Sequence, residues 1–210
     1  MKIIYEDRDI LIVCKEAGLA VQTKRPLEKD LESLIRAELY HRDGRAADLF
    51  LIHRIDQPVS GLVLFARSKK AAAILSAQLA DGTMKKIYLA RVSGKIPADE
   101  GTLTDWLIKD ARTNTSRIVP EGTRGAKRAV LSYRKAGDDA VRIELGTGRH
   151  HQIRVQLSGA GMPIRGDVKY GGEPLREEKR AGICLTASEL TFKHPRSGQV
   201  MTVKAPESVC

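Results

Sequence analysis

The chain has 210 residues, of which 42% are hydrophobic and 30% are charged. This composition is ordinary for a globular protein of about one domain and excludes a wholly disordered or fibrous chain. The uninterrupted apolar stretches run for only a handful of residues. A membrane-spanning helix needs about 20, so a transmembrane protein is also excluded.

The positive charge is unevenly distributed along the chain. The formal net charge is +10, but residues 1–50 carry −1 and residues 51–136 carry +9. A concentrated basic region attracts a polyphosphate backbone through charge pairing and counterion release. A nucleic acid is therefore a candidate partner, although a merely basic soluble protein has the same total charge. A membrane surface is disfavoured, because no basic amphipathic helix carries large apolar anchors.

The N-terminus lacks the features of a secretory signal. A short apolar run is followed at once by Glu6, Asp7 and Asp9, and no cleavage site is evident. We therefore expect a cytoplasmic protein.

The first half of the chain predicts short strands and two capped helices. The predicted strands lie at 3–5, 10–15 and 61–67. Apolar spacing predicts helices over 30–41 and 69–79, with Asp30 and Ser68 as their N-caps.

The second half is rich in β-patterns joined by turns. The predicted strands lie at 85–93, 102–108, 128–135, 140–145, 183–192 and 200–203, and a helix is predicted over 151–157. The unpatterned segment 109–127 reads as a mobile basic loop or a hairpin. We expect one α+β domain over residues 1–210, built on a central mixed, mostly antiparallel sheet flanked by helices and loops.

A first candidate site is the segment His53–Gly61, just before a buried strand. Pro58 and Gly61 predict a fixed, tight turn, which presents Asp56 two residues after Arg54. An ionised aspartate can act as a nucleophile at a sugar anomeric carbon or as a base. The alternative is a surface ion pair or an Asx-turn.

A second candidate is the segment Gly146–Arg154. Two glycines lead into a helix, whose exposed N–H groups can hold an anion beside Arg149 and Arg154. Adjacent His150 and His151 would point in different directions on a helix, and no His-x-x-x-His pair is present. We therefore expect no metal site.

A third candidate is the strand Lys85–Arg91. Lys86 and Tyr88 share a face, so an aromatic ring flanked by cations could stack on a base while the cations meet phosphates. The alternative is a tyrosine packed at the edge of a sheet.

Taken together, these motifs resemble the RluA-type RNA pseudouridine synthase family. The matching order is HRID-x-x-x-SG, K-x-Y-x-A and GR-x-HQIR, followed by Gly161–Asp167 and Tyr170-Gly171. The resemblance extends to both ends of the chain and implies the pseudouridine synthase fold. It covers the catalytic domain alone, and we expect no N-terminal S4 RNA-binding domain.

The resemblance implies a role for each matching residue. Asp56 occupies the position of the catalytic aspartate. Tyr88 matches the tyrosine that stacks on the target uracil and helps to remove the proton from C5. Arg154 matches the arginine that pairs with the catalytic carboxylate, and Arg54 the arginine associated with the gap left by a flipped nucleotide. The residues expected to contact RNA are Arg54, Arg149, His151 and Lys86.

The implied reaction converts uridine to pseudouridine in ribosomal RNA, transfer RNA or both, without a cofactor. Whether Asp56 attacks C1′ or removes a proton from C2′ stays open. We expect a monomer, and we expect the segment 109–127 to contact the RNA backbone.

Two other functions remain open from the residues. One is a non-catalytic RNA-binding protein on the same fold. The other is a glycosidic-bond hydrolase, which would usually need a second carboxylate, for which Asp167 is the weaker candidate.

Overall fold

The computed structural model describes residues 1–25, 28–175 and 182–206. The described chain forms two compact units. Unit 1 contains Met1–Met84 and the described residues from Thr186 onward, and unit 2 contains Lys85–Leu185. The expectation of a single domain over residues 1–210 stays a prediction.

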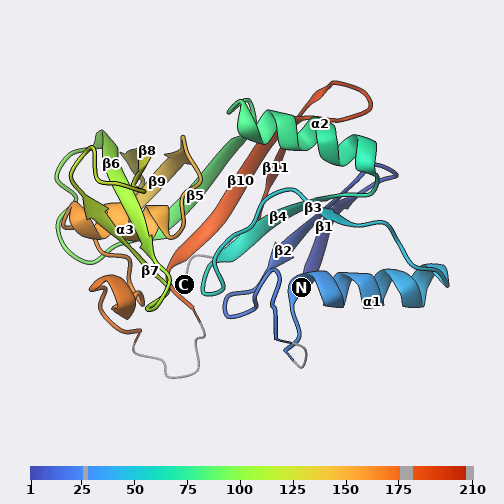
Figure 1. The fold of residues 1–210 in the computed structure, drawn as a ribbon, viewed down its shortest axis with the longest axis horizontal. Helices are drawn as coiled ribbons and strands as arrows, with labels where there is room; N and C mark the ends of the chain where they lie inside the picture. The colour runs from blue at the N-terminus through green and yellow to red at the C-terminus, as the bar shows by residue number, and fades with distance from the viewer. Residues whose placement is uncertain (26–27, 176–181, 207–210) are drawn as a thin grey trace. The chain divides into compact units, whose positions relative to one another are not determined.

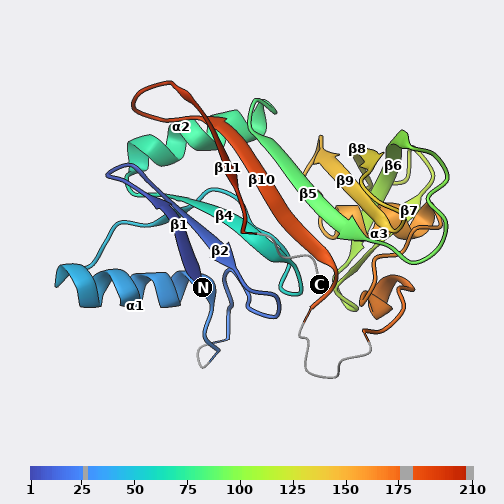
Figure 2. The ribbon, with the colours of Figure 1, turned by 180° about the vertical axis from the view of Figure 1, so that it is seen from behind.

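Unit 1 contains a sheet in the strand order β1–β2–β4–β10, with β11 on β10 and β3 on one end of β4 (Figure 2). The strands are β1 (Lys2–Glu6), β2 (Ile10–Lys15), β3 (Phe50–Leu51), β4 (Ser60–Ala66), β10 (Leu185–Lys193) and β11 (Val200–Lys204). β4 and β10 run parallel, whereas the other neighbouring strands named here run antiparallel. Such a pattern makes this a mixed, mostly antiparallel sheet.

Two helices belong to unit 1, α1 (Leu31–Asp43) and α2 (Lys69–Ala80) (Figure 1). Both predicted caps are confirmed. The Asp30 carboxylate accepts from the N–H of Ser33, which closes a capping box, and the Ser68 hydroxyl accepts from the N–H of Ala71. Ala71 and Leu75 of α2 join the core formed by alternate residues of β2, β4 and β10.

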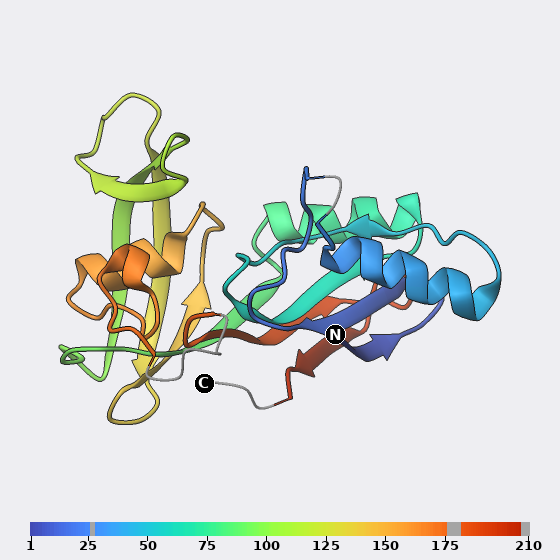
Figure 3. The same cartoon turned by 90° about the horizontal axis from the view of Figure 1, so that it is seen from below.

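Unit 2 contains an antiparallel sheet in the order β5–β9–β8–β6–β7. Its strands are β5 (Lys85–Arg91), β6 (Glu100–Asp110), β7 (Thr115–Val119), β8 (Lys127–Lys135) and β9 (Ala140–Leu145). The helix α3 (Gln152–Gly159) lies against β6 and β7 and is followed by the 3₁₀ turn η1 (Val168–Tyr170) (Figure 3). Of the two readings of segment 109–127, the hairpin is confirmed, because β7 pairs with β6.

The helix predicted over 151–157 is confirmed as α3 and is buried on nearly every side. All six residues from Gln152 to Leu157 are buried. The side-chain amide of Gln152 bonds to Thr147 and Val130, and the amide nitrogen of Gln156 donates to Asp105, whereas Oε1 of Gln156 has no hydrogen-bond partner among the described residues. The glutamines of this segment therefore pack α3 against the sheet.

The predicted α+β class with a mixed, mostly antiparallel sheet is confirmed. Within the described ranges, no helix has the length and apolar character needed to cross a bilayer.

Candidate functional site

Asp56 lies in a closed turn that leads into β4. The N–H of Val59 donates to the Asp56 carbonyl at 3.0 Å, which confirms the predicted tight turn. The turn is tied to the chain after β2 by two hydrogen bonds between Gln57 and Gly18, at 2.9 and 3.0 Å. Asp56 itself is partly exposed. The aspartate is thus held on a rigid turn while part of its surface stays open to solvent.

The far end of the turn is fixed to β10 by a close approach at Gly61. A Cβ at this position would lie 2.3 Å from the Ala187 carbonyl oxygen, and the φ of Gly61 is +114°. Only glycine adopts this conformation without strain and leaves room for the neighbouring strand. The hydroxyls of Ser60 and Thr186 add a 2.9 Å hydrogen bond between the same two strands.

A buried ammonium group supports the turn from within unit 1. The side chain of Lys15, at the end of β2, is 0% exposed. Its Nζ donates to the carbonyls of Glu16, Leu19 and Gln57, at 2.9, 2.7 and 3.1 Å. These three acceptors match the three protons of an ammonium group, as a buried charge requires.

Two opposing effects act on the charge of Lys15. Burial lowers its pKa to about 8, and the negative charge of Asp56 opposes this shift. The negative charge of Asp56 therefore favours the charged form of Lys15. Lys15 was not predicted from the sequence as a residue of the candidate site. The available signal was a lysine at the end of the apolar run ILIVCK, where a solvated charge is unexpected.

Tyr88 lies on β5 opposite Ile143 of β9 and is 6% exposed. Strand alternation places Lys86 on the same face, as expected. Burial lowers the pKa of Lys86, and its Nζ lies near the glycine loop, 3.6 Å from where a Cβ of Gly148 would be. Stacking of Tyr88 on a base stays a prediction.

Arg154 forms a buried, bidentate ion pair with Asp167. Its Nε and Nη2 donate to the two carboxylate oxygens, each at 2.7 Å. The side chains of Arg154 and Asp167 are only 5% and 1% exposed. Asp167 is therefore enclosed and engaged through both oxygens, which removes it as the second carboxylate of a hydrolase. The expected pairing of Arg154 with Asp56 joins residues of different units and stays a prediction.

Tyr170 lies beside the same arginine. The Cζ of Arg154 is 5.0 Å from the centroid of the Tyr170 ring, within the range of a cation–π contact. The Tyr170 hydroxyl accepts from the N–H of Ser116 at 2.8 Å and lies 2.7 Å from Nδ1 of His151. Burial, with the positive charge of Arg154, lowers the pKa of His151 to about 3. His151 is therefore neutral at pH 7, and its Nδ1 shares a hydrogen bond with the Tyr170 hydroxyl.

The expected divergence of His150 and His151 is wrong. Their rings are stacked, with centroids 3.8 Å apart and planes 23° from parallel. The reason is that His151 has a left-handed backbone, with φ of 53°, and the helix begins only at Gln152. The hairpin holds His150 in turn, through Ser116 at 2.9 Å and Asn114 at 3.2 Å.

Three backbone N–H groups of the glycine loop before α3 are not available to the expected anion site. The N–H groups of Gly146 and Thr147 donate to the Val130 carbonyl, and that of Arg149 donates to the Gln152 amide. These three N–H groups already donate to acceptors within the protein, so they are not free to bind an anion as expected. The side chain of Arg149 is exposed. It remains a candidate RNA contact.

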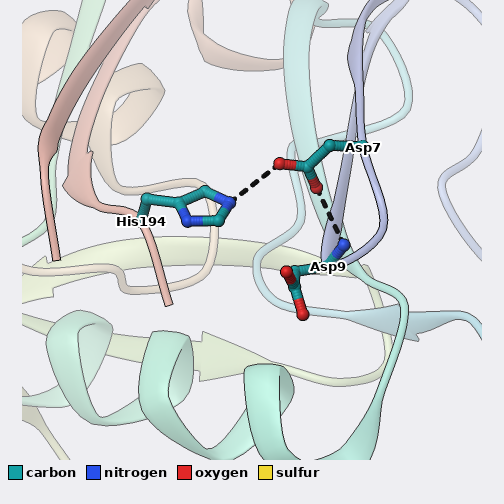
Figure 4. A group of neighbouring side chains, drawn as sticks. All are labelled: Asp7, Asp9 and His194. Carbon is teal, nitrogen blue, oxygen red and sulfur yellow. Dashed lines mark hydrogen bonds and ion pairs between the residues drawn. The ribbon is translucent and has the colours of Figure 1, made fainter. Parts of the chain in front are cut away.

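A further cluster of potential metal ligands, Asp7, Asp9 and His194, lies in unit 1 (Figure 4). Its ligand atoms are within 4.8 Å of one another. However, Asp7 accepts from His194 and from two backbone N–H groups, and Asp9 is paired with the guanidinium of Arg196. The cluster therefore joins the β1–β2 turn to the β10–β11 turn, and Arg196 already supplies its positive charge.

Comparison with known proteins identifies a family. A family model described as RNA pseudouridylate synthase matches residues 9–159. The chain is 32% identical over 209 residues to the uncharacterized RNA pseudouridine synthase YhcT of Bacillus subtilis (strain 168), covering 98% of this chain and 68% of that protein. It is 35% identical over 213 residues to the ribosomal large subunit pseudouridine synthase C of Escherichia coli (strain K12), covering 97% and 66%. The chain thus spans about two thirds of the length of these relatives.

Solved structures show the same fold. Human RNA pseudouridylate synthase domain containing 1 aligns with a TM-score of 0.76 and 26% identity, covering 98% of this chain and 83% of that one. Human RNA pseudouridylate synthase domain containing 4 aligns with a TM-score of 0.79 and 20% identity, covering 99% and 88%.

Proposed function

This chain belongs to the RNA pseudouridylate synthase family, and we propose that Asp56 is its catalytic carboxylate and ribosomal RNA its substrate. The enzyme is an isomerase that converts uridine in RNA to pseudouridine. The N1–C1′ bond breaks, a C5–C1′ bond forms, and the proton on C5 is replaced by one on N1. All atoms stay within one nucleotide, so the balance needs no co-reactant.

The observation that carries the assignment of Asp56 is the construction of its turn. A catalytic carboxylate must be ionised and held in one position. Gln57 ties the turn to the chain after β2, and the Lys15 ammonium lies beneath it, bonded to the carbonyl of the residue that follows Asp56. A surface ion pair or a simple Asx-turn would need no buried cation behind it.

The proposed chemistry uses Tyr88 and Arg154 of unit 2 together with Asp56. Tyr88 stacks on the extruded uracil and helps to remove the C5 proton, and Arg154 pairs with the ionised carboxylate. Asp56 then acts either as the nucleophile at C1′ or as the base at C2′. Both roles require the carboxylate in its charged form, which a nearby guanidinium favours.

Ribosomal RNA is the proposed substrate because a similar protein is named as an enzyme of the large ribosomal subunit. The relative from Escherichia coli is a ribosomal large subunit enzyme. Arg54 and Arg149 are exposed and Lys86 is half-buried, so we retain these three as RNA contacts. His151 is buried and neutral, which disfavours a direct phosphate contact.

We further propose that the enzyme acts as a monomer in the cytoplasm.

Pseudouridine mapping in a deletion strain tests the proposal. Ribosomal and transfer RNA from the strain are mapped after complementation with wild type, with Asp56→Asn or with an empty vector. We expect one or more ribosomal positions to lose pseudouridine and only wild type to restore them. Loss confined to transfer RNA would overturn the substrate assignment, and restoration by Asp56→Asn would favour a non-catalytic RNA-binding role.

A further inference from the structure

The guanidinium group of Arg154 is fixed in its plane by Asp167. The bidentate pair uses Nε and Nη2, each at 2.7 Å from a carboxylate oxygen. Two parallel hydrogen bonds define both the position and the tilt of a guanidinium group. The third nitrogen, Nη1, takes no part in this pair. Asp167 therefore fixes the orientation of the whole guanidinium group.

Tyr170 restrains the same group from its face. Its ring centroid lies 5.0 Å from the Arg154 Cζ. The ring is itself restrained, because its hydroxyl is bonded at 2.8 Å by the N–H of Ser116 and at 2.7 Å by His151. An aromatic ring anchored at its hydroxyl keeps its orientation relative to the cation.

Asp167 and Tyr170 lie in one tight loop, and both contact Arg154 of α3. The carbonyl of Asp167 accepts from the N–H groups of Tyr170 and Gly172, each at 2.9 Å. A Cβ at Gly172 would lie 1.9 Å from the Ile164 carbonyl oxygen, so this loop requires glycine there. The loop is thus shaped to present Asp167 and Tyr170 to the arginine together.

We propose that Asp167 and Tyr170 are positioning residues, which hold the guanidinium of Arg154 in the one orientation that its role in catalysis requires. This rests on the proposed function, in which Arg154 serves Asp56. Neither residue is a catalytic residue in this proposal. A buried ion pair is weak evidence for stability, since apolar residues of similar volume often replace one without loss. Apolar residues at these positions would not fix the orientation of the Arg154 guanidinium, whereas the ion pair with Asp167 does.

Steady-state kinetics on a transcript of large-subunit ribosomal RNA tests the proposal. For Asp167→Asn we expect kcat to fall by about 10²-fold, the cost of a slightly misplaced catalytic group, with KM within about threefold of wild type. Asp139→Asn is the matched control, because Asp139 pairs with Arg91 and Arg165 on a more exposed part of unit 2. We expect this control to keep the wild-type kcat.

A tyrosine series covers the case in which Asp167→Asn fails to fold. Tyr170→Phe keeps the ring over Arg154, whereas Tyr170→Leu removes it. We expect Tyr170→Phe, which keeps the ring but loses its hydroxyl anchor, to lose less kcat than Tyr170→Leu, which should lose about tenfold or more. Equal kcat values for Tyr170→Leu and wild type, in a folded protein, would overturn the role of Tyr170.

A double-mutant cycle separates positioning from an independent role. If Asp167 acts through Arg154, adding Asp167→Asn to Arg154→Gln lowers kcat no further than Arg154→Gln alone. Losses that multiply would overturn the inference.

The same measurements distinguish this inference from the proposed function. If Arg154→Gln keeps the wild-type kcat, the proposed function of Arg154 fails. If Arg154→Gln is inactive while Asp167→Asn and Tyr170→Leu keep the wild-type kcat, the proposed function stands and the positioning roles are wrong.

Discussion

The ammonium of Lys15 lies 3.1 Å from the carbonyl oxygen of Gln57, the residue that follows Asp56. This contact joins the end of β2 to the turn that presents the proposed catalytic carboxylate. A buried charge is retained here at a desolvation cost, which lowers the pKa of Lys15 to about 8.

Replacement of Lys15 by methionine is expected to destabilise the protein at pH 7. Methionine fills a similar volume but removes the ammonium donor from three carbonyl oxygens, of which, among the described residues, only that of Gln57 keeps a second donor, the N–H of Gly18. We expect the free energy of unfolding to fall by about 2 kcal/mol, measured by urea denaturation. Lys24→Met, at an exposed lysine of the same unit, should have little effect. Equal loss in both variants would contradict this account of Lys15.

The same pair of proteins gives a pH-dependent difference of defined sign. The pKa of Lys15 is depressed in the folded state, so between about pH 8 and pH 10.5 the unfolded chain binds more protons. The contribution of this group to stability is therefore full above its unfolded pKa and is lost as the pH falls toward 8. Wild type should gain up to about 3 kcal/mol relative to Lys15→Met over this interval. A difference that does not vary with pH would contradict the buried ammonium.

His151 is expected to stay uncharged in mildly acidic solution. Burial lowers its pKa to about 3, because a protonated ring would be desolvated beside Arg154. A side-chain ¹⁵N NMR titration should find the ring of His151 neutral at pH 5, with the signal assigned by its absence in His151→Gln. The contribution of this group to stability is present above pH 6.5 and is lost as the pH falls toward 3. A ring that titrates near pH 6.5 would show that the contact with Tyr170 is not maintained.

Gly61→Ala is expected to disrupt the link between β4 and β10. The added Cβ would lie 2.3 Å from a backbone oxygen, at a φ of +114°. Gly82→Ala is the matched control, since its φ is +78° but nothing lies within 4 Å of the added atom. We expect the control to lose about 1–2 kcal/mol from conformation alone, and Gly61→Ala to lose clearly more or to fail to fold. Similar thermal denaturation midpoints for the two variants would contradict this close approach.

The basic hairpin is expected to bind the RNA backbone. Three exposed basic residues lie here: Arg117 on β7, Arg124 in the loop that follows and Lys127 at the start of β8. Reversing the three charges should weaken RNA binding and make its salt dependence shallower, by about one unit of slope for each lost phosphate contact. Filter binding across a salt series measures both quantities. An unchanged affinity and slope would exclude the hairpin as an RNA contact.

Local patterns were sufficient for most elements of the fold. The helix starts at Asp30 and Ser68 follow from side chains that bond their own backbone, and alternating or buried apolar runs mark the strands. The helix predicted over 151–157 is observed as Gln152–Gly159, but the burial of its glutamines against β8 and β6 was not predicted. Tertiary burial of this kind leaves no periodic trace in a sequence.

The candidate site could be predicted only where a motif identifies it. Asp56, Tyr88 and Arg154 come from the resemblance of three ordered motifs. Lys15 and Asp167, which hold the turn of Asp56 and the guanidinium of Arg154, could not be predicted in these roles. Their roles depend on contacts between residues apart in the chain, such as that of Lys15 with Gln57. The stacking of His150 on His151 depends on a left-handed residue that no helical pattern predicts.

The most direct test of the central claim is single-turnover pseudouridine formation by purified Asp56→Asn on a ribosomal RNA transcript. Asp48→Asn, at an exposed aspartate of the same unit, is the matched control. The account predicts no detectable pseudouridine with Asp56→Asn, RNA affinity within about threefold of wild type, and wild-type product formation by the control. Product formation by Asp56→Asn at a rate near that of wild type would show that Asp56 is not the catalytic carboxylate.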